Sequence, residues 1–478
     1  MKKTLAAVIV LTGLGLAAMV AHAAVQNDRD YQRLIRQGDD AMSRGQTLEA
    51  IDEFSGAIAL KRASMLAYLK RGEAQHHRGD SPEALTLALR DLRTASELDP
   101  GATRAQEELG DVNFQLHRYE NAAESYEAYL KLDDGSAVVF YKLALAARGQ
   151  GETTHAVSAL RNAVQLNPSF AEAHYVLGLC LKDRGQLKDA QSSFERAIAI
   201  SPALIPPREE LADLHRLQAQ TREEIEQLEA LAALDPTRPE RLIAVGLAYS
   251  RAGHAEQAVT ALGRAVERFH DYPGVYAALG EIWLETAEDR DDKSALRKAL
   301  EALEPVASQA SASSEILGLY GRALALNGQN DEAERAFKMA AETFPTDPTV
   351  LPQFASIARR LGHLQDARQA LERYAMLVDE DHDQAAHAAQ IGDLSLQLND
   401  PASAVSWYEK SASLAVPDAG LLAHLADAQL TTGRVDAARS TIARALAKDP
   451  TNPSVRAAAL RIQHVAQPVP QEVKPQNQ

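Results

Sequence analysis

Cysteine is almost absent from this sequence, and aromatic residues are scarce. The 478 residues include one cysteine, Cys180, which excludes an internal disulfide and any zinc site with more than one thiolate ligand. Aromatic residues make up 5% of the chain and alanine is abundant, a balance that favours closely packed helices over strands. The composition therefore predicts an all-α protein in which Cys180 is a core residue.

The motifs that carry catalysis are also missing. There is no nucleophile elbow, no phosphate-binding loop and no HExxH zinc motif, and no pair of carboxylates stands out among the acidic residues. His76 and His77 are adjacent, but neighbouring helical residues point about 100° apart, which is poor geometry for a chelate. We therefore predict a protein that is not an enzyme and that holds neither a cofactor nor a metal.

Positive charge is in deficit. The formal net charge is -16, so the field of the chain itself would oppose a long contact with nucleic-acid phosphates. Hydrophobic residues make up 46% and charged residues 24%, which is ample apolar material for a folded core. The composition thus excludes nucleic acid as a partner and predicts a folded body.

Long hydrophobic runs are absent except at the N-terminus. There, two lysines precede an apolar run that closes on Ala-His-Ala at 21–23, the pattern of a secretory cleavage site. We predict a signal peptide over residues 1–23, cleavage before Ala24, and export to the periplasm. An inner-membrane anchor is the alternative if the segment stays uncleaved. No cysteine follows the run, so a bacterial lipoprotein is excluded.

What the chain does contain is an internal repeat of about 34 residues. In the stretch LGLYGRALALNGQNDEAERAFKMAAETFP, positions 8, 15, 20, 24, 27 and 32 of the unit are Gly321, Gly328, Ala333, Phe337, Ala340 and Pro345. An earlier stretch repeats the same skeleton with Gly178, Gly185, Ala190, Phe194, Ala197 and Pro202. About twelve units follow one another, with position 8 at Gly38, Gly72, Gly110, Ala144, Gly178, Ala212, Gly246, Gly280, Gly321, Ala355, Gly392 and Ala426.

Each repeated position has a physical reason. Small residues at 8, 20 and 27 allow two helices to approach closely, and the aromatic residue or leucine at 24 fills the space between neighbours. Glycine at 15 ends the first helix of a unit, and proline at 32 stops the second. Two units are longer than the rest, through one extra helical turn in residues 81–100 and through the acidic insertion TAEDRDDKS, which we expect to form a loop.

This skeleton resembles the tetratricopeptide repeat. The resemblance implies an all-α solenoid, a right-handed superhelix of about twelve helix hairpins over residues 24–450. Residues 451–467 are expected to form one more amphipathic helix that caps the last open face. Residues 468–478, PVPQEVKPQNQ, have too little apolar content to fold and are expected to form a disordered tail.

The resemblance also implies a partner-binding groove, because the first helices of such hairpins typically line a concave surface that accepts a peptide or a helix. The groove-facing positions map onto Phe114, Tyr141, Lys142, Leu145, Arg148, Tyr175, Val176, Leu179, Lys182, Ile243 and Leu247. Exposed aromatic and aliphatic side chains there would anchor a partner. The alternative is that some of them pack against neighbouring helices.

One subtype of the family is excluded by residue identity. Members that clamp the C-terminal carboxylate of a chaperone carry lysine at 5 and asparagine at 9, and asparagine at 6 of the next unit. Here Tyr141, Leu145 and Val176 occupy these positions. The best hypothesis is an exported bacterial scaffold that binds proteins in an envelope assembly, such as exopolysaccharide export machinery. The alternatives are a glycan-binding or glycan-modifying protein and a membrane-anchored assembly factor.

Overall fold

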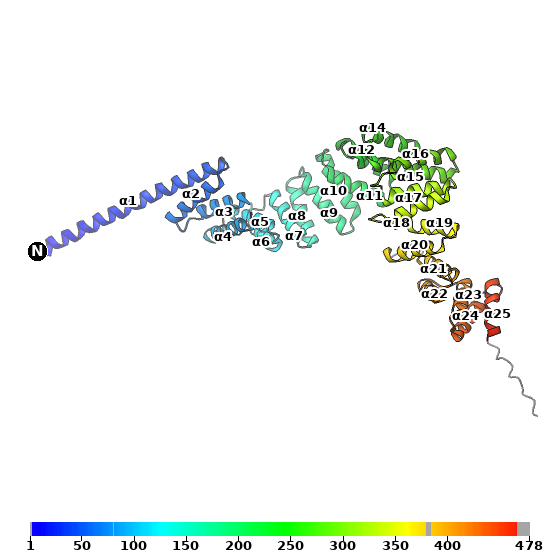
Figure 1. Cartoon of the computed structure of the whole chain (residues 1–478). Coiled ribbons are helices and arrows are strands. Elements are labelled where there is room, and N and C mark those ends of the chain that lie inside the picture. Colours follow the sequence, from blue (N-terminus) through cyan, green and yellow to red (C-terminus); the bar gives the residue numbers. More distant parts are fainter. Residues whose placement is uncertain (1, 80, 379–383, 466–478) are drawn as a thin grey trace, which may run out of the picture. The chain divides into compact units, whose positions relative to one another are not determined.

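The computed structural model describes residues 2–79, 81–378 and 384–465, with the backbone alone for residues 2–18 and 465. The described chain consists of 25 helices and contains no strand, which confirms the predicted all-α class. It divides into a first unit that ends at Leu234 and a second unit that begins at Asp235. Within each unit, successive helices pair as hairpins and the hairpins pack in chain order (Figure 1).

The first unit holds six hairpins. Its helices are α1 (Lys2–Ser43), α2 (Thr47–Leu60), α3 (Met65–Arg78), α4 (Pro82–Leu98), α5 (Thr103–Gln115), α6 (Tyr119–Leu132), α7 (Ala137–Gly149), α8 (Thr153–Leu166), α9 (Ala171–Asp183), α10 (Leu187–Ile200), α11 (Ile205–Leu217) and α12 (Thr221–Leu234). From α5 onward the odd-numbered helices have 13 residues and the even-numbered ones 14, so two helices and two short turns account for the repeat length.

The second unit holds six more hairpins and a final single helix. Its helices are α13 (Pro239–Arg251), α14 (Ala255–Arg268), α15 (Pro273–Arg290), α16 (Lys293–Ala307), α17 (Ser314–Leu326), α18 (Asn330–Glu342), α19 (Val350–Leu361), α20 (Leu364–Leu377), α21 (Gln384–Gln397), α22 (Pro401–Leu414), α23 (Ala419–Thr431), α24 (Val435–Lys448) and α25 (Pro453–Val465). The segment predicted to cap the array is thus helical, and it buries Val455, Ala458 and Ile462 against α23 and α24.

The contact between positions 8 and 24 sets the spacing inside each hairpin. A Cβ added at any of the eight position-8 glycines would come closer than 3.0 Å to the position-24 side chain of the same hairpin. The pairs are Gly38 and Phe54, Gly72 and Leu92, Gly110 and Tyr126, Gly178 and Phe194, Gly246 and Leu262, Gly280 and Leu303, Gly321 and Phe337, and Gly392 and Tyr408. The large side chain therefore fills the space of the absent Cβ in its own hairpin rather than a space between units.

The turn between the two helices of each hairpin requires a left-handed residue. All the positive-φ residues of the described chain lie at this junction, and eight of them are glycines. In the other four hairpins His117, Ala219, Asp291 and Asn399 adopt φ of 57°, 55°, 48° and 58°. The turn geometry is thus kept where glycine is missing, at the cost of a conformation that L-residues other than asparagine and aspartate rarely adopt.

Of the two longer units, one has the predicted structure and the other does not. The extra turn of the second hairpin lengthens α4, as the sequence predicted. The acidic insertion of the eighth hairpin does not form a loop, because α15 continues to Arg290 and the turn is delayed to Asp291. Since Ala287 is buried within this extension, packing against the hairpin favours continued helix.

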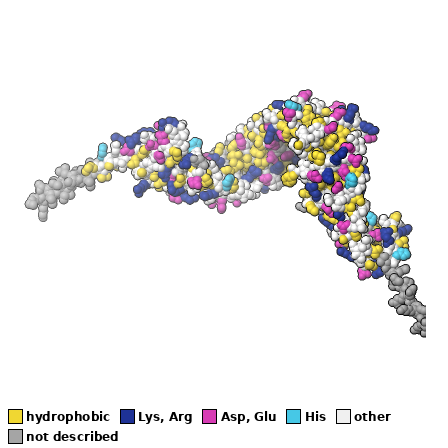
Figure 2. Space-filling view, in the orientation of Figure 1, with side chains coloured by type: hydrophobic (Ala, Val, Ile, Leu, Met, Phe, Trp, Pro, Cys, Tyr) yellow, Lys and Arg dark blue, Asp and Glu magenta, His cyan; other side chains and the backbone are white. Residues whose placement is uncertain are grey.

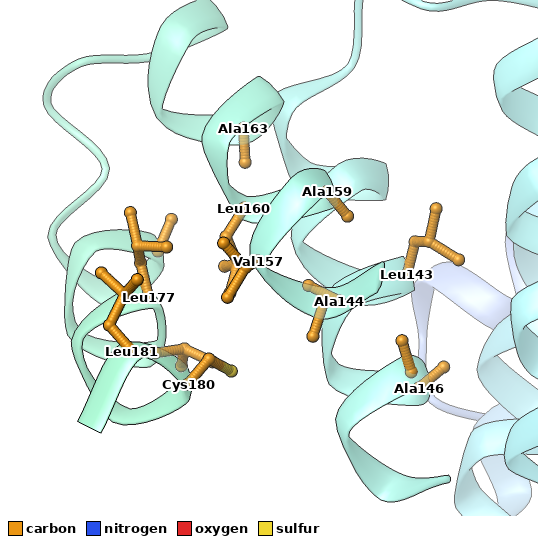
Figure 3. Close-up of a cluster of buried hydrophobic side chains, with 14 of the residues drawn as sticks. Leu143, Ala144, Ala146, Val157, Ala159, Leu160, Ala163, Leu177, Cys180 and Leu181 are labelled. Carbon is orange, nitrogen blue, oxygen red and sulfur yellow. The ribbon is translucent and has the colours of Figure 1, made fainter. Parts of the chain in front are cut away.

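The core of the first unit is built mainly of alanine and leucine. Figure 3 shows part of this cluster, with Leu143, Ala144 and Ala146 from α7, Val157, Leu160 and Ala163 from α8, and Leu177, Cys180 and Leu181 from α9. Cys180 of α9 is fully buried in this cluster, and burial raises the pKa of its thiol. The only cysteine of the chain is therefore a packing residue.

The predicted segments at the two ends of the chain stay predictions. Helix α1 includes residues 2–18, for which only the backbone is described, and the expected tail 468–478 lies outside the described residues. Within the described part of the chain, no helix has the length and apolar character that crossing a membrane requires.

Candidate partner-binding surface

The residues predicted to bind a partner lie on the first, odd-numbered helices of the hairpins. They are Phe114 on α5, Tyr141, Lys142, Leu145 and Arg148 on α7, Tyr175, Val176, Leu179 and Lys182 on α9, and Ile243 and Leu247 on α13. The structure brings the first nine onto three consecutive odd-numbered helices of the first unit. The last two belong to the second unit.

Five apolar residues of the first unit form what we call the aromatic surface. They are Phe114, Tyr141, Leu145, Tyr175 and Leu179, all of them half-buried and packed on the alanine and leucine core. The Tyr141 ring lies 5.0 Å from that of Phe170, centroid to centroid. Figure 2 shows hydrophobic side chains gathered where α7 to α10 lie.

The two tyrosines of this surface keep their hydroxyl groups free. Among the described residues, neither the Tyr141 nor the Tyr175 hydroxyl makes a hydrogen bond, although burial raises the pKa of both. A ring fixed on a core with an unused polar atom at its edge is characteristic of interface tyrosines. These two side chains can thus offer a partner both apolar area and a hydrogen bond.

Three of the predicted apolar residues lie outside the aromatic surface. Val176 is 5% exposed and belongs to the core of the first unit, because its position on α9 turns it toward the neighbouring helices. Ile243 and Leu247 are partly buried against Leu262 and Ile282 of the second unit. Val176 therefore presents no surface to a partner.

The cations proposed for the groove are already engaged. Lys142 Nζ donates to Glu107 at 2.8 Å and to Asp111 at 2.7 Å, and Lys182 Nζ donates to Glu210 at 2.6 Å. Arg148 is the loosest of the three, with its Nε 3.8 Å from Asp183; this carboxylate belongs to the next odd-numbered helix, α9. These side chains link neighbouring hairpins and do not stand free for a ligand.

Such links recur along the odd-numbered helices of both units. They include Lys70 with Asp39, Arg104 with Glu73, Arg322 with Glu288, and Arg461 with Asp427. Hydrogen-bonded partners lie 28 to 35 residues apart, close to one repeat. The sequence analysis did not predict these links between hairpins, although a charge that recurs with opposite sign one repeat away was the available signal.

Two of the links reach into the core through a tyrosine. The Tyr126 hydroxyl donates to Asp111 at 2.7 Å, and Asp111 in turn accepts from Lys142 of the next hairpin. At the other site the Tyr408 hydroxyl donates to Asp393 at 2.6 Å, and Nδ1 of His424 lies 3.2 Å from the same carboxylate oxygen. A buried hydroxyl thus finds its acceptor at the edge of the core.

The adjacent histidines of α3 line a hollow of about 570 Å³ between the second and third hairpins. His76 Nδ1 lies 2.9 Å from Glu108, and this hydrogen bond is the main cause that raises the pKa of the imidazole. Arg104 of α5 binds Glu73 and Glu108 in the same hollow. In the described part of the chain, no three His, Cys, Asp or Glu side chains cluster in a way that could hold a metal ion.

With this repeat and its packing established, comparison with family models identifies the class. Tetratricopeptide repeat models match residues 35–92, 85–137, 141–205, 203–380 and 395–462. The chain belongs to the tetratricopeptide repeat family. Repeats of this class are protein–protein interaction modules, so the chain is an interaction scaffold in the broad sense.

Individual relatives match only in part. The small glutamine-rich tetratricopeptide repeat-containing protein 2 of Mycosarcoma maydis is 31% identical over 108 residues, which are 23% of this chain and 30% of that protein. Among solved structures, MamA is 22% identical over 37% of this chain and 93% of its own, with a TM-score of 0.35. Yeast Tom70 is 14% identical over 79% of this chain and 98% of its own, with a TM-score of 0.40. The family assignment therefore rests on the repeat models.

Proposed function

We propose that this protein is a non-catalytic scaffold that binds a protein partner on the aromatic surface of its first unit. The observation that carries the proposal is the pair Tyr141 and Tyr175, whose rings are fixed on the core while their hydroxyls have no partner among the described residues. Tyrosines held in this way lose little conformational entropy on binding and often dominate interface energies.

The test is partner capture by a double variant. Changing Tyr141 and Tyr175 together to alanine should abolish capture of the partner from an envelope extract, measured by affinity purification and mass spectrometry. The matched control changes Tyr276 and Tyr320 to alanine, two partly buried tyrosines on odd-numbered helices of the second unit. Unchanged capture by the first variant, with circular dichroism like the wild type, would contradict the proposal.

The proposed site of action is the periplasm of a Gram-negative bacterium. The support is the leader pattern of residues 1–23, with two lysines, an apolar run and a small-x-small end. N-terminal sequencing of the protein from cells should give Ala24 as the first residue. An intact leader together with membrane-bound protein would favour the anchored assembly factor instead.

Within the envelope, we assign the scaffold to an assembly of the kind that exports exopolysaccharide. The support is the resemblance of long exported tetratricopeptide arrays to the periplasmic parts of such exporters. Mass spectrometry of the captured partners tests it directly. Polysaccharide synthesis or pore proteins are expected, whereas direct binding of soluble glycans without any protein partner would support the glycan-binding alternative.

A further inference from the structure

The odd-numbered helices of the second unit carry a row of carboxylates that the predicted site did not include. Glu281, Glu285 and Glu288 follow one another at i, i+4 and i+7 on α15 and therefore share one face. Glu315 of α17 lies close enough to Glu281 to contribute to the raised pKa of that carboxyl. We call these four residues the acidic row.

Three described arginines, Arg251, Arg322 and Arg360, lie near the acidic row. Arg322 of α17 donates from Nε to Glu288 at 2.8 Å and pairs through a second nitrogen with the other carboxylate oxygen. The pKa of Glu281 is raised mainly by burial. The neighbouring carboxylates of Glu285 and Glu315 raise it further, and Arg322 and Arg251 offset this increase only in part. Four carboxylates against these three guanidinium groups leave an excess of negative charge among the described residues.

A hollow of about 570 Å³ adjoins the acidic row and shares Glu288 and Arg322 with it. The apolar part of its lining consists of Ala325 and Leu326 from α17, Phe337 from α18, and Pro352 and Ile357 from α19. Leu326 is 46% exposed, so its side chain is accessible to a ligand. The hollow has the size and the mixed lining of sites that accept one or two side chains of a ligand.

We infer that this surface docks a polypeptide segment in which a lysine or arginine stands next to a branched aliphatic residue. The cation would lie on the acidic row and the aliphatic side chain in the hollow beside Leu326. Charge complementarity selects this occupant, because the excess of carboxylates repels acidic segments and nucleic acid. The inference rests on the proposed function in taking a protein as the partner, but it concerns other residues in the other unit.

The experiment measures binding of labelled synthetic peptides to the full chain by fluorescence anisotropy. A peptide that alternates lysine and leucine should bind, and matched peptides with glutamate for lysine or serine for leucine should bind at least about tenfold more weakly. Added salt should weaken the binding of the peptide that contains lysine, because part of its affinity is electrostatic. Equal binding of the lysine and glutamate peptides would overturn the inference.

Two variants locate the site on the chain. Glu281→Gln with Glu285→Gln removes charge from the acidic row, and Leu326→Ser removes the apolar anchor. Each variant should bind the peptide of alternating lysine and leucine about tenfold more weakly, or weaker still. The controls are Glu256→Gln with Glu267→Gln on α14, and Leu377→Ser on α20, which alter exposed residues away from the site.

The remaining outcomes are decisive as well. If controls and site variants bind the peptide alike, the surface is not the docking site. If the wild type self-associates in sedimentation and the site variants do not, the occupant is a second copy and the inference is wrong. The variant with Tyr141 and Tyr175 changed to alanine should still bind the peptide, so failure of the proposed function would leave this result untouched.

Discussion

The junction between α5 and α7 and the junction between α21 and α23 share one construction and differ in the cation that completes it. In both, a tyrosine at position 24 fills the space over a position-8 glycine and donates to an aspartate at position 9. In the first unit the next hairpin supplies Lys142 to that aspartate, and in the second unit it supplies His424. The comparison separates what the repeat requires from what each junction adds.

What the repeat requires is an acceptor for a buried phenol. Burial is the main cause that raises the pKa of Tyr126 and Tyr408, and the aspartate adds to it, so both hydroxyls stay protonated and donate. Hairpins with phenylalanine at position 24 need no such acceptor. Leu179 and Arg322 stand at position 9 in two of them, and Asp39 in the third, the hairpin of Phe54, pairs with Lys70 instead. The buried tyrosine therefore requires the aspartate, whereas the aspartate can occur without the tyrosine.

What each junction adds is the response to pH. Hydrogen bonds to Asp111 and Glu107 outweigh the burial that would lower the pKa of Lys142, so this cation stays charged over the physiological range. The hydrogen bond to Asp393 is the main cause that raises the pKa of His424, with burial opposing it. One junction is permanently ionic and the other titrates.

The largest expected effect tests the shared part of the construction. Gly110→Leu and Gly392→Leu would each place a Cβ closer than 3.0 Å to the tyrosine ring of the hairpin. Each should lower the free energy of unfolding by roughly 1 to 3 kcal/mol, and Gly178→Leu under Phe194 should do the same. Thermal and urea unfolding followed by circular dichroism measure this.

The control for these variants is Gly263→Leu on α14, where no atom lies within 4 Å of an added Cβ. This change should cost nothing, because leucine has the higher helix propensity. Similar melting of all the variants would contradict the register of positions 8 and 24.

The next effect removes the acceptor. Asp111→Ala and Asp393→Ala leave a buried hydroxyl without a partner and should each cost about 1 to 3 kcal/mol. Combining each with Tyr126→Phe or Tyr408→Phe should recover most of the loss, since the orphaned hydroxyl is gone. A double-mutant cycle measures the coupling, and additive losses would show that the tyrosine does not depend on the aspartate.

The smallest effect exchanges the cations. A histidine whose pKa is raised by folding stabilises fully below its ordinary pKa near 6.5 and loses this contribution as pH rises through the raised pKa. His424→Lys should therefore reduce the stability lost between acidic and mildly alkaline pH, and Lys142→His should increase it. Both groups are partly exposed, so each change should be less than about 1 kcal/mol.

The difference in stability between the wild type and each exchange variant, measured at each pH, removes the contribution of the other histidines. Asp427 and Asp418 also raise the pKa of His424, and Arg359 acts on Asp393. Asp427 and Asp418 should therefore shift the position of the transition without changing its sign. Identical pH profiles of the two exchange variants would mean that the junctions do not differ in the way described.

The sequence was sufficient for the repeat and its packing positions. Gly321 and Phe337 occupy the two helices of one hairpin as the register predicts, although Phe337 fills the space over Gly321 rather than a space between units. The sequence did not predict that α15 continues through the acidic insertion. There the burial of Ala287 favours helix over loop. Ala219 shows the same limit, because the turn is imposed by the hairpin and not by its own preference.

The candidate surface was predicted less well than the fold. Tyr141 and Tyr175 lie at the surface of the core as their positions indicate, but Val176 lies inside it. The hollow beside Leu326 was missed because its lining comes from several helices, whose mutual distances no single repeat encodes. A surface that is formed by several hairpins cannot be predicted from the sequence of one repeat alone.

Hydrogen–deuterium exchange of the full chain with and without its captured partner tests the central claim most directly. Binding on the aromatic surface predicts slower exchange in α5, α7 and α9, and no change in α6, α8 and α10. Slower exchange confined to the even-numbered helices, or no protection anywhere in the first unit, would contradict the account.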